Sequence, residues 1–179
     1  MALYIGGTAV DATAAELNLL DGETGVNTGG NKKVFLQANA GTGASWSGGG
    51  LGGGTPYLTA NGGSSFVTAR WTTPSDFSSL TSCHMVLYYA DSNGNAYLEI
   101  TSGTFDGGDI SATAQDSIAA TTYAVADGQW TKSDVTAAVN GLTLSSGELF
   151  AIMVKRDDGH ENDTALTNLW LSGFIIVYS

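Results

Sequence analysis

Two histidines, His84 and His160, and one cysteine, Cys83, are the side chains best suited to nucleophilic or general-base chemistry. Cys83 and His84 are adjacent in an apolar run, and neighbouring residues of a strand point to opposite faces of a sheet. They are therefore not expected to act together as a nucleophile and its base. The sequence also lacks a Gly-x-Ser-x-Gly element, a phosphate-binding loop and zinc-ligand spacing. We expect no catalytic residues, no enzyme activity and no cofactor.

The most acidic stretch of the chain holds four carboxylates within seven residues: Asp157, Asp158, Glu161 and Asp163. Oxygen-rich loops suit Ca²⁺, which takes six to eight oxygen ligands, so these four residues are the candidate metal ligands. Their spacing does not match an EF-hand, and an exposed acidic turn is the alternative interpretation.

Aromatic side chains offer a different kind of site, a platform on which sugar rings could stack. The candidates are spread along the chain: Trp71, Tyr88, Tyr97, Trp130 and Trp170. Tyr97 and Glu99 would share one face of a strand and combine a ring with a hydrogen-bond acceptor. Tryptophan also packs in cores and interfaces, which is the alternative role for these residues. A carbohydrate-binding module, or a domain that recognises a receptor glycan, is therefore our second functional hypothesis.

Composition limits the elements that could position these side chains. Of the 179 residues only 13% are charged, while 25 are glycine. This favours strands and turns over helices with solvated outer faces. The formal net charge of −11 argues against nucleic acid and anionic membrane surfaces as partners. We find no signal peptide at the N-terminus, and the apolar segment 169–178 is too short to span a bilayer, so we expect a soluble protein.

The chain divides into three parts. Residues 1–22 are expected to form an N-terminal arm with one short helix at 11–22, whose apolar residues Leu17, Leu19 and Leu20 must dock on another surface. Residues 23–54 form a Gly-rich linker that includes a strand at 33–38. Residues 55–179 carry the remaining strand signals.

Short apolar runs separated by turn residues predict an all-β domain, an antiparallel β-sandwich of jelly-roll type with the helical arm before it. We expect short helical turns at 74–80 and 133–139. The expected strands are 65–71, 83–89, 96–101, 110–117, 121–125, 149–156 and 167–178.

The last strand is apolar on both faces, although one sandwich can bury only one of them. With strict alternation, one face carries Trp170, Phe174, Ile176 and Tyr178. Exposed apolar faces of this kind mark interaction sites. The linker, the N-terminal arm or a partner subunit must cover this second face. We predict a partner subunit, with these four residues as the interface of a homo-oligomer.

The segment Thr13–Gly22, with the sequence TAAELNLLDG, resembles an element of bacteriophage tail-fibre and other structural proteins. The order of the segments 74–77, 130–135 and 154–158 before the final strand is similar to jelly-roll modules of phage fibres and capsid decorations. These resemblances imply a homotrimer on the virion, made in the host cytoplasm, with other virion proteins as partners. They also imply that the N-terminal arm, with Leu17, Leu19 and Leu20, attaches the protein to the virion.

Overall fold

In the long strands of the sandwich, alternate side chains are buried. From Cys83 to Tyr89 every second side chain is buried, and those between are partly exposed. Successive side chains of a strand point to opposite faces, so one face of the sheet joins a core and the other faces outward. The computed structural model describes residues 4–5, 8–9, 30–47, 55–59, 64–91, 93–104 and 115–179.

The chain forms two units, residues 1–31 and residues 32–179. In the first, β1 (Tyr4–Ile5) pairs antiparallel with β2 (Thr8–Ala9). The helix expected at 11–22, with Leu17, Leu19 and Leu20, lies outside the described residues. The anchoring arm therefore stays a prediction.

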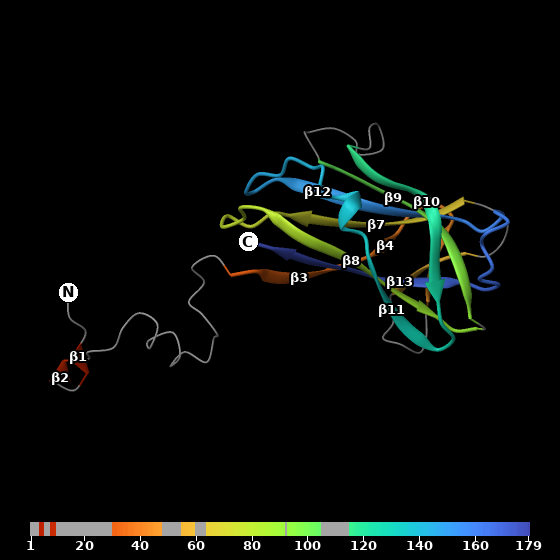
Figure 1. Ribbon diagram of the computed structural model, residues 1–179, viewed down its shortest axis with the longest axis horizontal. Coiled ribbons are helices and arrows are strands. Elements are labelled where there is room, and N and C mark those ends of the chain that lie inside the picture. The colour runs from red at the N-terminus through yellow and green to blue at the C-terminus, as the bar shows by residue number, and fades with distance from the viewer. Residues whose placement is uncertain are drawn as a thin grey trace. The chain divides into compact units, whose positions relative to one another are not determined.

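The second unit is an antiparallel β-sandwich, which appears in Figure 1 as two layers of strands. Within the described residues, one layer is a five-stranded sheet in the order β10-β9-β12-β7-β4. Its strands are β4 (Asn39–Ala40), β7 (Ser64–Thr72), β9 (Gly94–Thr104), β10 (Asp116–Val125) and β12 (Leu149–Asp157).

The other layer is a six-stranded sheet in the order β11-β8-β13-β6-β5, and β3 also pairs with β13. Its strands are β3 (Lys32–Gln37), β5 (Ala44–Ser47), β6 (Thr55–Leu58), β8 (Leu80–Tyr89), β11 (Gln129–Asp134) and β13 (Leu169–Tyr178). In Figure 1 the blue β13 runs beside β8 and β3.

The chain changes sheet at most of its connections, as it does in jelly-roll sandwiches. The prediction of an all-β antiparallel sandwich is confirmed. The turn expected at 133–139 contains a short 3₁₀ helix, η2 (Thr136–Ala138), whereas the segment 74–80 forms a turn without a helix. The strand β11 was not predicted.

Part of the segment 23–54, which we expected to be a linker, is integral to the sandwich. Leu36 on β3 and the adjacent Ala38 are buried in the core, and β4 pairs with β7. The strand expected at 33–38 is therefore present as β3, and the compact unit begins at Lys32.

The core lies between the two sheets and is filled by one face of each. The six-stranded sheet contributes Met85, Leu87 and Phe174, and the five-stranded sheet contributes Ile100 and Phe150, all fully buried. The remaining question for function is what the two outer faces carry.

Candidate functional site

Four aromatic side chains form a continuous row across the outer face of the six-stranded sheet. Strand pairing places Trp130 of β11 beside Tyr88 of β8. It also places Trp170 of β13 between Tyr88 and Tyr57 of β6. Along the sequence of contacts Trp130–Tyr88–Trp170–Tyr57, the ring centroids are 5.0, 5.9 and 6.1 Å apart. We call these four side chains the aromatic row.

Local alternation explains why these rings face outward. Tyr88 lies between two core residues of β8, and Trp170 lies between two core residues of β13. Their neighbours Leu87, Tyr89, Leu169 and Leu171 are fully buried. Because the period of a strand is two, the residue between two core positions must leave the core.

The aromatic row is separate from the aromatic part of the core. Trp130 is 46% exposed and the other three rings are partly exposed. In contrast, Trp71 and Tyr178 pack against the core cluster, and Trp71 contacts the rings of Phe77, Phe150 and Tyr178 at 5.1–5.9 Å. The four members of the row contact one another and do not belong to the core cluster.

The sequence had suggested five platform residues, and the structure brings three of them together: Tyr88, Trp130 and Trp170. Trp71 belongs to the core, and Tyr97 lies on the five-stranded sheet. Sequence reasoning missed Tyr57. The alternation in Thr55–Leu58, with Pro56 and Leu58 buried, is the signal that could have identified it.

The predicted oligomer interface needs correction. Phe174 and Ile176 are fully buried in the chain's own core, and Tyr178 packs on that core, so only Trp170 of the four faces outward. The cause is an irregularity in the pairing of β13 with β8 between Leu171 and Gly173. Such a bulge inserts one residue and reverses the alternation beyond it.

Polar side chains continue the outer face of β11 beyond Trp130. Lys132 and Asp134 are paired with Val86 and His84, so all four lie on the same face as the row. Thr136 donates hydrogen bonds to the Asp134 carboxylate from its hydroxyl and its backbone N–H, at 2.6 and 2.9 Å, and these lower the pKa of Asp134. Lys132 places an exposed ammonium donor two residues from Trp130, on the same face of the strand.

Cys83 lies on the opposite, core-facing side of β8 and is fully buried. Burial, and to a smaller extent the negative charge of Asp134, raises the pKa of its thiol to about 12. A neutral, inaccessible thiol is a poor nucleophile, so the structure supports a buried and inert role for Cys83.

The acidic loop is built around an ion pair and does not assemble its four carboxylates. Asp163 accepts hydrogen bonds from the Nε and an Nη atom of Arg156, both at 2.9 Å, and both side chains are almost completely buried. Arg156 also donates to the carbonyls of Thr167 and Ala165. Asp163 further accepts the backbone N–H of Tyr97 at 3.0 Å.

This ion pair separates Asp163 from the other three candidate calcium ligands. Asp163 serves as the counter-ion of Arg156, while Asp157 and Glu161 are exposed and Asp158 is partly exposed. Among the residues that the structure describes, no group of three or more Asp, Glu, His or Cys side chains could hold a metal ion.

One face of the Tyr97 ring is covered by a neighbouring side chain. The imidazole of His160 stacks on it with a centroid distance of 3.7 Å and an interplanar angle of 6°. Glu99, on the same strand face, lies 3.9 Å from the Lys155 ammonium. The loop that carries His160 thus covers the platform face expected at Tyr97.

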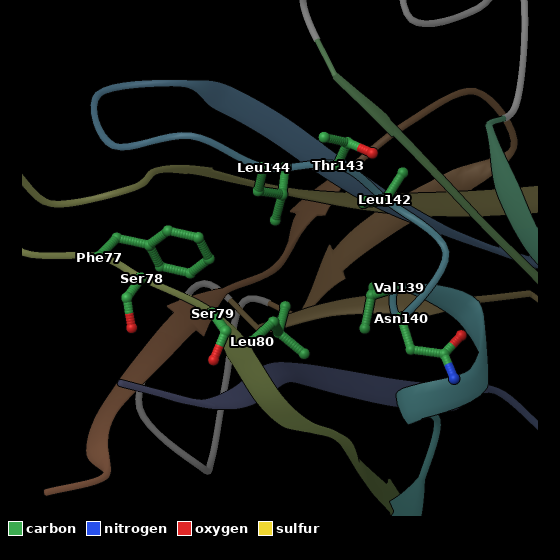
Figure 2. Close-up of a pocket in the computed structure, with 9 residues that line it drawn as sticks. All are labelled: Phe77, Ser78, Ser79, Leu80, Val139, Asn140, Leu142, Thr143 and Leu144. Carbon is green, nitrogen blue, oxygen red and sulfur yellow. The ribbon is translucent and has the colours of Figure 1, made fainter. Parts of the chain in front are cut away.

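A pocket of about 330 Å³ lies between the segments 77–80 and 139–144. In Figure 2 the side chains of Phe77, Leu80 and Leu144 point toward a common space. The hydroxyls of Ser78 and Ser79 hydrogen-bond to Ser179. The lining contains no ionisable side chain, so the pocket has no group for acid–base chemistry.

No described helix is long and apolar enough to cross a membrane. No protein-family model matches the chain, and no curated protein matches it.

Solved structures similar to this chain include an isomalto-dextranase of Arthrobacter globiformis T6 complexed with panose. The TM-score is 0.52 at 16% identity, over 83% of this chain and 23% of that chain. The present chain therefore spans less than a quarter of the enzyme. This similarity supports the fold.

Two further similar structures are carbohydrate-binding modules. One is CBM36 in complex with calcium and xylotriose, with a TM-score of 0.43 and 14% identity over 82% of this chain and 98% of that chain. The other is a family 11 module from Clostridium thermocellum in complex with a mixed-linked tetrasaccharide. Its TM-score is 0.42 at 11% identity, over 85% of this chain and 89% of that chain.

Proposed function

We propose that this protein is a non-catalytic glycan-binding domain and that the aromatic row is its binding site. The observation that carries the proposal is the position of the row. Four rings contact one another across four strands, on a sheet face directed away from the core.

The chemistry of the row suits a sugar. One face of a pyranose ring presents C–H groups that pack on aromatic rings, while its hydroxyls require hydrogen-bond partners at the edges. Tyrosine and tryptophan combine an apolar body with one polar group, and are therefore favoured where one side is apolar and the other is wet. Lys132 adds a donor beside Trp130. Binding of this kind requires no bond to be made or broken.

A glycan array followed by calorimetry on the best ligand tests the proposal. We expect Trp130→Ala and Trp170→Ala each to weaken binding about tenfold, which corresponds to about 1.4 kcal/mol of lost stacking. Phe35→Ala is the matched control, because Phe35 is 50% exposed, lies on the same sheet and is outside the row.

Two results would contradict the proposal. One is an array without any bound glycan for a folded protein. The other is binding that the Phe35 and Trp130 variants weaken equally, since the row would then have no special part in it.

We also propose, from the sequence element at residues 13–22, that the domain belongs to a bacteriophage particle. Glycan binding would then recognise a surface of the host cell. The arm would attach the domain to the particle through Leu17, Leu19 and Leu20. Assembly as a homotrimer would present several aromatic rows together. Mass spectrometry of purified particles and light scattering of the isolated protein test these two points. A protein absent from particles, or monomeric at all concentrations, would overturn the corresponding point.

A further inference from the structure

We propose that the aromatic row binds the interior of a single, twisted polysaccharide chain and does not bind the flat face of a crystalline polysaccharide. This inference rests on the proposed glycan-binding function and specifies its ligand. It follows from three properties of the row: its direction, the tilt of its rings and its open ends.

The row runs across the strands. Each ring comes from a different strand, and each pair is in direct register. Its centroid spacings of 5.0–6.1 Å accordingly lie a little above the ~4.8 Å that separates neighbouring strands. A ligand that contacts all four rings must therefore be an extended chain lying perpendicular to the strands.

Neighbouring rings of the row are strongly tilted relative to one another. The interplanar angles are 46° for Tyr88 and Trp130, 62° for Tyr88 and Trp170, and 56° for Tyr57 and Trp170. Part of this rotation follows the twist of the sheet, which turns each strand by about 20–25° relative to the next.

These tilts distinguish between two kinds of glycan surface. A crystal face holds its sugar rings in one plane, and no two neighbouring rings of the row can lie flat on one plane. A single chain can rotate about its glycosidic bonds, so that each successive sugar faces a ring of different orientation. The row is therefore complementary to a chain in solution.

Within the part of the chain that the structure describes, both ends of the row are open. Trp130 lies on β11, which is an edge strand among the described residues, and its ring is the most exposed of the four. At the other end Tyr57 is paired with Ser45 of β5, whose small exposed side chain forms no wall. A glycan chain can continue past either end, and none of the described residues there would select a reducing or a non-reducing terminus.

Two experiments on the full chain test this inference. The first is depletion of the protein from solution by microcrystalline cellulose and crystalline chitin, compared with their swollen amorphous forms and with soluble mixed-linkage β-glucan, xylan and dextran. We expect at least tenfold stronger binding to a soluble or amorphous polymer than to any crystalline one.

The second experiment is calorimetry with oligosaccharides of two to six units derived from the polymer that binds best. We expect affinity to rise up to about four units and then level off, since each ring accepts one sugar. Chemical reduction of the chain end should change the affinity of the longest oligomer less than twofold. Trp130→Ala should shorten the series by one unit, whereas Phe35→Ala should leave it unchanged.

Equal binding to crystalline and amorphous forms would overturn the inference while leaving glycan binding intact. So would an affinity that is already maximal for a disaccharide or that is lost on reduction of the chain end. Failure to bind every soluble and insoluble polymer would overturn both this inference and the proposed function.

Discussion

At the scale of single residues, the pair formed by Arg156 and Asp163 has the largest structural consequence. Both side chains are almost fully buried, and Arg156 holds the carbonyls of Ala165 and Thr167 while Asp163 holds the backbone N–H of Tyr97. One ion pair thereby connects the acidic loop, the end of β12 and the start of β9.

We expect Asp163→Asn to lower the free energy of unfolding by about 3–5 kcal/mol, because it leaves the Arg156 charge buried without a counter-ion. Urea denaturation followed by tryptophan fluorescence measures this. Glu99→Gln is the control, since it removes the exposed ion pair with Lys155 and should cost less than ~1 kcal/mol. Equal losses in the two variants would contradict the structural role given to Arg156.

Burial of Cys83 leads to a second expectation at this scale. With its pKa raised from 9.0 to about 12, the thiol stays neutral at pH 8. We expect the folded protein not to react with a disulfide reagent such as DTNB at pH 8, and the guanidinium-unfolded protein to release one equivalent. A native reaction rate near that of the unfolded chain would refute this.

The same shift has a defined pH dependence. The pKa of the Cys83 thiol is higher in the folded than in the unfolded chain. Its contribution to the free energy of unfolding is therefore fully present below pH 9.0 and is lost as the pH rises toward about 12. Cys83→Ala should therefore show a smaller loss of unfolding free energy over that interval than the wild type.

At the scale of elements, the irregularity in β13 decides which side chains reach the outer face. It directs Trp170 outward before the bulge and Phe174 inward after it. Gly173 is required there, because its φ is +154° and an added Cβ would meet the carbonyl oxygen of Leu36 and approach the Phe35 ring at 2.9 Å.

We expect Gly173→Ala to destabilise the protein by about 1–3 kcal/mol, through overpacking against β3 and an unfavourable backbone conformation. It should also weaken glycan binding, because the position of Trp170 depends on the bulge. Thermal unfolding and calorimetry measure the two effects. Gly159→Ala, which would make only an ordinary contact with Asp157, is the control and should be nearly neutral.

The elements also explain how far prediction from the sequence could go. Short apolar runs bounded by turn residues identified β8 and the C-terminal strand. The bulge in β13 leaves no comparable sign beyond Gly173 itself, and strict alternation therefore assigned Phe174 and Ile176 to the wrong face. The strand β11 was missed because four of its six residues are exposed and it lacks an apolar period.

The aromatic row was predicted only in part, because the sequence does not show which strands pair. Tyr88 and Trp170 could be recognised as strand residues, but their contact depends on strand pairings that are distant in sequence. Nothing in the sequence joins Tyr57 to Trp170, which is more than one hundred residues away. Likewise, the four carboxylates near residue 160 suggested a metal, because the sequence does not show that Arg156 is buried as the partner of Asp163.

At the scale of the whole molecule, the division after Asn31 predicts that the sandwich folds without the first unit. We expect a chain that begins at residue 30 to unfold cooperatively, with a midpoint within about 2 °C of the full-length protein, and to keep its glycan affinity. Circular dichroism and calorimetry measure both. A truncated chain that fails to fold would show that residues 1–29 complete the sandwich.

The outward-facing position of Trp170 also links recognition to assembly. A subunit contact that covered Trp170 would hide the rings that meet the sugar, so one copy could not use them for both purposes at once. A trimer that still binds its receptor must therefore be held together by surfaces other than the aromatic row. If the same rings formed the subunit contact, a long soluble glycan would compete for them and dissociate the subunits.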